Sequence, residues 1–288
     1  MYLLLALAAA AAYGAADFLG GVAARRSPVV AVIVVSQALA LALVLVAAPL
    51  LAAVPSRTEL LWGAVAGLAY GVGLILLYRG LAFGQMSVVA PITGICAPSL
   101  PVLFGLMSGE RPGAWALAGI VLAIVAIVLI CWGAAGDAPP ASSQDGGEVA
   151  SGRTVVLTAL GAGVAMGLFF IALAQTHAQA GLWPLVATRA VTVACYLLVA
   201  ASRQQSLRLA PQALRAALAG GALDIGANTL YLLSVRGGLL SLAATVTSLY
   251  PITTVLLASV VLRERLRRPQ SLGLACAAAA VLLITSTR

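Results

Sequence analysis

The chain alternates between long apolar stretches and short polar connections. Ten stretches of roughly 20 residues are built almost entirely from apolar side chains. A helix that crosses the ~30 Å hydrocarbon core of a bilayer needs about 20 residues at 1.5 Å each. Because backbone groups in lipid must bond internally, stretches of this length and uniformity predict membrane-spanning helices and not barrel strands. The expected spans are residues 3–22, 29–48, 60–82, 87–107, 115–132, 154–174, 183–201, 213–234, 240–262 and 271–286.

Composition supports this class of protein and defines its organisation. Hydrophobic residues make up 62% of the chain and charged residues 8%, and no stretch is left for a soluble domain. The longest polar segment, residues 133–153, has the Pro, Gly and Ser content of a flexible linker. We therefore expect an all-α membrane protein with a five-helix unit over residues 1–132, a linker over residues 133–153 and a second five-helix unit over residues 154–288.

The net charge and the positions of the cysteines limit which ligands and binding partners the chain is expected to have. The net charge is +8, every basic residue is Arg, and these residues sit mostly on short connections. Anionic lipid head groups therefore fit them better than nucleic acid. The four cysteines lie within spans without the spacing of metal ligands, which predicts neither a metal site nor a disulfide. We expect no cofactor, a multi-pass location in the inner (cytoplasmic) membrane, and a monomer or homodimer.

The two halves share an ordered set of features. A Leu-Tyr pair precedes a proline by the same spacing in each half, at an offset of 153 residues, and a Glu-Arg pair follows each proline at a span end. The pairs and prolines are Leu77-Tyr78, Pro98 and Glu110-Arg111, and then Leu230-Tyr231, Pro251 and Glu264-Arg265. Five spans is an odd number, so the second half enters the membrane in the opposite sense. This predicts an inverted repeat, an architecture common in secondary transporters with a site near the midplane.

This pattern resembles the EamA group of the drug/metabolite transporter superfamily. The resemblance covers essentially the whole chain and rests on the order and duplication of the proline and Glu-Arg features. It implies a permease or exporter of small organic metabolites, amino acids or drugs. Members of this group commonly carry an Arg near the start of the second helix of each repeat. Arg189 fits that place in the second half, whereas Gln37 occupies it in the first.

Polar residues inside spans are the candidate functional residues, because charges at membrane depth cost at least about 2.5 kcal/mol. Asp224 lies near the centre of the eighth span, and Asn228 and Tyr231 follow at i+4 and i+7 on the same helix face. This stripe predicts either a cavity wall that contacts substrate or a coupling proton, or a structural hydrogen-bond network between helices.

Two more charged residues lie inside spans. Asp17, with Tyr13 four residues before it, either lines the same cavity and carries a proton or reaches interfacial water and Arg25 or Arg26. Arg189 should pair with Asp17 or Asp224, snorkel to the interface, or grip substrate carboxylates.

Aromatic residues of the third span are further candidates. Tyr70 and Tyr78 could stack on or hydrogen-bond an organic substrate. The alternative is a position in the interfacial aromatic belt, which fits Tyr78 better because Arg79 follows it.

Prolines in the fourth and ninth spans are the candidate gates. Pro91, Pro98 and Pro101 share one face of the fourth span, whereas the ninth has only Pro251 and should be interrupted less. Proline frees backbone carbonyls, which is tolerated where helices line a cavity or pack closely. Both spans therefore read as moving gates or as closely packed helices.

These features favour a secondary transporter that alternates access around a central cavity. The chain has no Walker A sequence, so energy should come from a proton gradient, from exchange or from the gradient of the substrate. An intramembrane enzyme would need a catalytic constellation, such as paired aspartates or a zinc motif, and we assign no catalytic residue. A passive channel is the third possibility, although no filter sequence or charged ring is evident.

Overall fold

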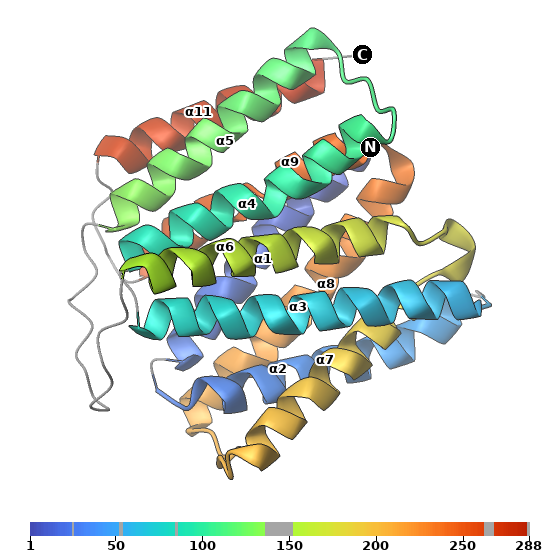
Figure 1. The fold of residues 1–288 in the computed structure, drawn as a ribbon, viewed down its shortest axis with the longest axis vertical. Coiled ribbons are helices and arrows are strands. Elements are labelled where there is room, and N and C mark those ends of the chain that lie inside the picture. The colour runs from blue at the N-terminus through green and yellow to red at the C-terminus, as the bar shows by residue number, and fades with distance from the viewer. Residues whose placement is uncertain (25, 52–53, 84–85, 136–151, 262–267, 287–288) are drawn as a thin grey trace. The chain divides into compact units, whose positions relative to one another are not determined.

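The computed structural model describes residues 1–24, 26–51, 54–83, 86–135, 152–261 and 268–286. These residues are helical with short connections and contain no strand, which confirms the all-α prediction (Figure 1). The α-helices are α1 (Tyr2–Ala24), α2 (Val29–Ala47), α3 (Arg57–Phe83), α4 (Met86–Met107), α5 (Ala114–Ala135), α6 (Gly152–Ala174), α7 (Trp183–Ser202), α8 (Pro211–Gly237), α9 (Leu240–Thr247), α10 (Tyr250–Val261) and α11 (Arg268–Ser286). Two 3₁₀ turns, η1 (Ala48–Leu51) and η2 (Ala178–Ala180), extend the connections.

The helices have the length and apolarity of membrane spans. Seven of them within the described residues could cross a bilayer by these criteria, and two shorter apolar segments, Cys96–Met107 and Ala114–Leu129, accompany them. The chain is therefore a multi-pass helical membrane protein. Each of the ten expected spans coincides with one helix except residues 240–262, which hold both α9 and α10. The arrangement as two inverted repeats stays a prediction.

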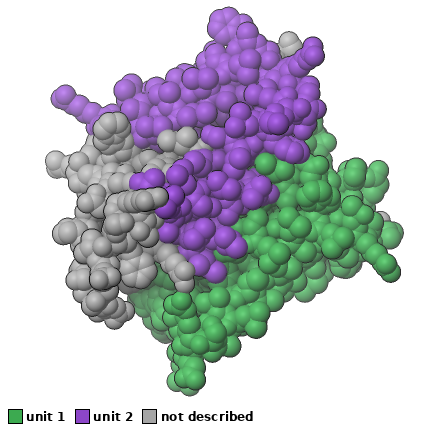
Figure 2. All heavy atoms as spheres, viewed as in Figure 1, with its two compact units in different colours: residues 1–71, 169–238 green, residues 72–168, 239–288 purple. Residues whose placement is uncertain are grey.

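The helices form two compact units, coloured separately in Figure 2. Unit 1 comprises residues 1–71 and 169–238, and unit 2 comprises residues 72–168 and 239–288. Each unit draws helices from both halves of the sequence, and α3 and α6 contribute residues to both units. The expected boundaries at residues 132 and 154 remain predictions, and most of the expected linker, residues 136–151, lies outside the described residues.

Unit 1 is held together by an antiparallel pair, α1 and α8. Ser234 Oγ donates a hydrogen bond to the carbonyl of Tyr2 (2.8 Å) at one end. Farther along, Gly220 faces the carbonyl of Ala16. A Cβ atom added to Gly220 would lie 3.4 Å from that carbonyl oxygen. Small residues permit this close approach between backbones in a membrane, where van der Waals packing drives helix association.

A ladder of hydrogen bonds joins α3 to α7 in the same unit. Three hydroxyl groups spaced four residues apart on α7 donate to three glycine carbonyls with the same spacing on α3. The bonds run from Thr188 to Gly63 (2.9 Å), from Thr192 to Gly67 (3.0 Å) and from Tyr196 to Gly71 (3.4 Å). The glycines bring the two backbones within reach of these short side chains, so this ladder fixes the position of α7.

Helices of unit 2 also pack closely through small residues. Gly163 and Gly167 of α6 lie against α4, where added Cβ atoms would approach the carbonyls of Thr93 and Ala97 to 3.2 and 3.1 Å. The helices α5 and α11 run side by side (Figure 1) and pack through buried alanines, including Ala123, Ala126, Ala277 and Ala280. Helices with such small side chains can approach closely along their whole length.

The ninth span is broken and the fourth is continuous. The sequence predicted the opposite, because the fourth span contains more prolines. The helix α4 continues from Met86 to Met107 although it contains three prolines. The ninth span stops at Thr247 and restarts at Tyr250. Pro251 is the second residue of α10, where its missing N–H has no helical carbonyl to bond. Leu249 N–H bonds Val246 O (3.2 Å) and Ile252 N–H bonds Leu249 O (3.0 Å), which makes the connection a tight turn.

Candidate functional site

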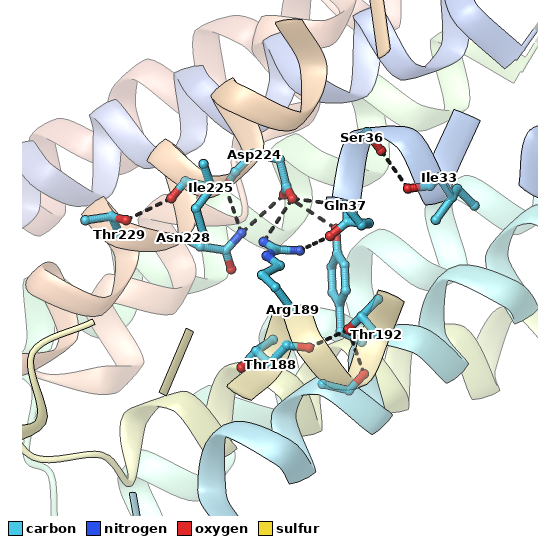
Figure 3. A network of polar contacts seen from close by, with 12 residues as sticks. Ile33, Ser36, Gln37, Thr188, Arg189, Thr192, Asp224, Ile225, Asn228 and Thr229 are labelled. Carbon is cyan, nitrogen blue, oxygen red and sulfur yellow. Dashed lines mark hydrogen bonds and ion pairs between the residues drawn. The ribbon is translucent and has the colours of Figure 1, made fainter. Parts of the chain in front are cut away.

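A buried ion pair lies at the centre of unit 1. Arg189 Nη2 of α7 is 2.9 Å from Asp224 Oδ2 of α8 (Figure 3). Arg189 is fully buried and Asp224 is 7% exposed. An isolated charge at this depth would be expensive, and a partner on a neighbouring helix lowers that cost. The expectation that Arg189 pairs with one of the two intramembrane aspartates is confirmed, and the partner is Asp224.

Three polar side chains complete the surroundings of Asp224. Gln37 of α2 accepts a hydrogen bond from Arg189 Nη1 through Oε1 and donates one from Nε2 to Asp224 Oδ2 (3.2 Å). Asn228 Nδ2 donates to Asp224 Oδ1 (3.2 Å) and to its backbone carbonyl (2.8 Å). Tyr70 of α3 donates its hydroxyl to Asp224 Oδ1 (3.4 Å). Four helices of unit 1 thus meet at one carboxylate.

Tyr70 also contacts the positive partner. The guanidinium carbon of Arg189 lies 5.0 Å from the centre of the Tyr70 ring, within the range of a cation–π interaction. One aromatic side chain therefore binds both ions of the pair, donating to the carboxylate and facing the guanidinium.

Aromatic residues continue from the ion pair towards the end of α6. Phe169 packs on Tyr70, with ring centres 5.0 Å apart, and Phe170 packs on Tyr231 at 4.7 Å. Tyr231 also donates its hydroxyl to the carbonyl of Phe170 (3.2 Å). Tyr13 of α1 meets Phe170 edge to face at 6.4 Å. The three tyrosines predicted at Tyr13, Tyr70 and Tyr231 therefore gather around two adjacent phenylalanines.

Two fully buried polar atoms of the network lack a partner among the described residues. They are Arg189 Nε, a donor, and Asn228 Oδ1, an acceptor. The orientation of the Asn228 amide is fixed by the two bonds of its nitrogen to Asp224. Buried polar groups are normally satisfied, so this donor and this acceptor are the atoms of the network that still have hydrogen-bonding capacity.

Asp17 differs from Asp224 in its surroundings. Its side chain is exposed, and no hydrogen bond or ion pair joins it to any residue in the described ranges. It lies close enough to Asp224 for the two carboxylates to interact electrostatically. Of its possible arginine partners, Arg26 instead bonds Gln212 of α8, and Arg25 lies outside the described residues.

The remaining predicted residues lie apart from this network. The side chains of Tyr78 and Pro91 are outside what the structure describes. Pro98 and Pro101 are buried on α4, and Pro251 is partly exposed on α10, all three in unit 2. The structure therefore brings together Tyr13, Tyr70, Arg189, Asp224, Asn228 and Tyr231, with Asp17 nearby.

Two carboxylates outside the network were missed as functional candidates by sequence reasoning. Glu110 accepts hydrogen bonds from the amides of Leu240 (2.6 Å) and Ser241 (2.9 Å), so it caps the start of α9. Glu59 accepts the backbone N–H of His177 (3.1 Å) and lies 2.8 Å from its ring Nδ1. Their only sequence signal was a position at a span end, where acidic residues are common.

The comparisons with known proteins agree with this architecture. The model of the EamA-like transporter family matches residues 153–286, which confirms the resemblance to the EamA group over the second half of the chain. No curated protein matches the sequence. A solved structure titled "Crystal structure of protein" is 17% identical, with a TM-score of 0.78, and the match covers 99% of this chain and 96% of that chain. That likeness shows the fold alone.

The class is therefore a multi-pass helical membrane protein. Residues 153–286 are similar in sequence to the EamA-like transporter family.

Proposed function

We propose that this protein is a secondary transporter of small organic metabolites, such as amino acids or drugs, in the cytoplasmic membrane. It works by alternating access around a central cavity, and the Arg189–Asp224 pair is the polar centre of its substrate path. The observation that carries the proposal is the 2.9 Å ion pair, enclosed by apolar helices. Apolar residues of similar volume would often stabilise a helix bundle equally well, so a buried ion pair is more useful for function than for stability.

The network suggests how the substrate is held. Arg189 Nε and Asn228 Oδ1 are the unpaired donor and acceptor that a polar group of the substrate would satisfy. The apolar part of the substrate would pack on Tyr13, Tyr70 and Tyr231. Binding in this way replaces contacts within the Arg189–Asp224 network and so couples occupancy of the site to the positions of the helices that carry it.

The prolines of unit 2 are proposed as the moving parts. The break between α9 and α10 supplies a flexible point inside a span, and broken helices recur in transporters. Pro91, Pro98 and Pro101 on α4 would play the corresponding part in the first half. Energy would come from a proton gradient, from exchange or from the gradient of the substrate.

Counterflow in proteoliposomes tests the proposal. Vesicles are loaded in turn with unlabelled amino acids and other metabolites, and uptake of the same labelled compound is followed. Saturable counterflow of one compound by the wild type, with loss in Asp224→Asn and retention in Arg203→Gln, supports the assignment. Arg203 is the matched control because it is an exposed charge at the end of α7. Normal counterflow in Asp224→Asn would remove Asp224 from the substrate path.

A further inference from the structure

The start of α8 lies against the connection between α1 and α2. Ser27 Oγ accepts a hydrogen bond from the Ala210 N–H (3.2 Å), and Gln212 Oε1 accepts one from Arg26 Nη1. Buried residues of α1, α2 and α8 also pack there in one apolar cluster, which contains Ala23, Val32, Ala213 and Ala217. The α1–α2 connection and the first turns of α8 therefore form one surface of unit 1.

Three exposed arginines belong to this surface. The side chain of Arg26 reaches Gln212, and Arg215 follows Gln212 by three residues, so both guanidinium groups share one face of α8. Arg208 lies in the connection just before α8. Arg203, farther back in that connection, instead follows the last turn of α7, where the negative end of the helix dipole favours a positive charge.

No acidic residue of these segments compensates the three charges. Residues 18–58 and 149–223 contain neither Asp nor Glu, so both connections and the helix ends beside them have no carboxylate of their own. Within the described ranges, none of the three arginines forms an ion pair. Like charges on one helix face repel each other, and an anion between them replaces the repulsion with charge-assisted hydrogen bonds. The surface therefore suits a negatively charged partner.

The length of α8 places this surface at the level of lipid head groups. The helix has 27 residues, or about 40 Å at 1.5 Å each, whereas the hydrocarbon core of a bilayer is about 30 Å thick. It therefore extends beyond the core, and Arg215 belongs to a projecting end because a charge is costly inside. The exposed side chains of Leu214 and Leu218 flank this arginine, so the basic surface borders on the acyl chains.

The other end of α8 provides a contrast. Arg236, in the last turn, donates hydrogen bonds to the carbonyls of Thr176 (3.4 Å) and Gly181 (2.8 Å). Glu59 lies close enough to Arg236 for the two charges to attract each other. Groups of the protein itself thus hold the charge at that end, whereas the arginines at the start of α8 have no such partner. A lipid site is therefore expected at the start of α8 and not at its end.

We propose that Arg26, Arg208 and Arg215 bind an anionic phospholipid, whose phosphate group takes the place of the missing carboxylate. The guanidinium groups donate to the phosphate oxygens, which they match in geometry. The acyl chains lie along Leu214 and Leu218. The occupant is a lipid and not a soluble phosphate, because the basic surface is continuous with exposed apolar side chains of a membrane span. Negatively charged lipids attract basic segments at the membrane surface in this way.

Lipid binding by the full-length protein in detergent micelles tests the proposal. Native mass spectrometry counts the lipid molecules retained as phosphatidylglycerol or phosphatidylcholine is added. We expect the wild type to bind phosphatidylglycerol in preference to phosphatidylcholine, and added salt to weaken that binding. The triple variant Arg26→Gln/Arg208→Gln/Arg215→Gln should bind phosphatidylglycerol at least about tenfold more weakly. Lysine at the same three positions should restore most of the affinity, because the positive charges remain.

A second triple variant with the same change in net charge is the control. It replaces exposed arginines outside this surface, in Arg57→Gln/Arg111→Gln/Arg203→Gln. This variant should bind phosphatidylglycerol like the wild type. Every substituted position is exposed, so both triple variants should fold, and their unfolding temperatures without added lipid check this.

Three results would overturn the proposal. The first is equal binding of the two lipids by the wild type. The second is equal affinity of the two triple variants for phosphatidylglycerol, which would mean that net charge alone attracts the lipid. The third is displacement of phosphatidylglycerol by an equal concentration of inorganic phosphate, which would assign the surface to a soluble anion. None of these measurements involves transport, so the lipid site and the proposed function can fail independently of each other.

Discussion

Arg189 and Asp224 lie 35 positions apart in the sequence and form a 2.9 Å ion pair between α7 and α8, inside a bundle of apolar helices. Gln37 of α2 bonds both partners, and Tyr70 of α3 contacts both as well. One pair of charges thus links four helices, and a change in either partner is expected to affect all of them.

Removing one charge of the pair should be worse than removing both. Arg189→Gln or Asp224→Asn leaves an uncompensated buried charge, which typically destabilises a protein by about 3–5 kcal/mol. The double variant leaves no charge and should recover most of that loss. Thermal unfolding in detergent micelles measures the effect, with Arg203→Gln as the control that should unfold like the wild type. Losses that simply add in the double variant would show that the two side chains are not coupled.

Gln37 should matter less than the charges that it bridges. Gln37→Leu removes its bonds to Arg189 and to Asp224 but leaves the ion pair intact. The buried groups that lose a partner should lower stability by about 1–3 kcal/mol. The same unfolding measurement checks this, with Gln205→Leu, an exposed glutamine in the connection after α7, as the control. A loss as large as that of Arg189→Gln would mean that Gln37, and not the charge pair, organises the network.

The glycine ladder gives a matched pair of variants on one helix. A Cβ atom at Gly67 would meet the Thr188 carbonyl oxygen at 2.5 Å and its Cα at 3.0 Å, whereas one at Gly71 would meet nothing within 4 Å. Gly67→Ala should therefore push α7 away and cost about 1–3 kcal/mol. Gly71→Ala should be neutral or stabilising, because Ala favours the helix. Equal unfolding temperatures for the two variants would contradict the close packing of α3 on α7.

The hydrophobic pattern was enough to predict the helices, because membrane spans are defined by length and apolarity. Pairing of Arg189 with an aspartate was predictable for a similar reason, since only Asp17 and Asp224 were clearly inside spans. The choice between them was not predictable, because it depends on how α1, α7 and α8 are rotated about their axes. Sequence reasoning also read Gln37 only as a departure from a family pattern, although the structure shows it in contact with Arg189.

The number of prolines in a span was a wrong guide to where the helix breaks. Three prolines in α4 leave that helix continuous, whereas the single Pro251 follows a turn between α9 and α10. The effect of a proline depends on whether neighbouring groups replace its lost hydrogen bond, and such packing is not visible in periodicity. The glycine ladder of α3 escaped notice for the same reason, because glycine spacing is informative only when the facing helix is known.

Glu110 should stabilise the first half of the broken span. Its carboxylate accepts two amides at the start of α9, where the helix dipole favours a negative charge. Glu110→Ala should lower stability by about 1–2 kcal/mol, as for the loss of other helix caps. Arg111→Ala, at the exposed neighbouring position, is the control. Unfolding curves that coincide for the two variants would rule out capping by Glu110.

The break itself can be tested at Pro251. In Pro251→Ala the new N–H can bond the carbonyl of Thr247, which favours one continuous helix over residues 240–261. We expect slower counterflow with an unchanged apparent affinity, because a straight helix would hinder the proposed gate. Pro211→Ala changes a proline at the start of α8, where no helical bond is at stake, and should transport normally. An unchanged rate in Pro251→Ala would exclude the break as a moving part.

The most direct test of the central claim is counterflow by the double variant Arg189→Gln/Asp224→Asn, performed with the compound that the wild type exchanges. This variant keeps polar side chains of similar size and should be folded, since no buried charge is left unpaired. If the pair is the centre of the substrate path, the double variant will unfold near the wild-type temperature and show no saturable counterflow. Counterflow at the wild-type rate would contradict the account and assign the pair a purely structural role.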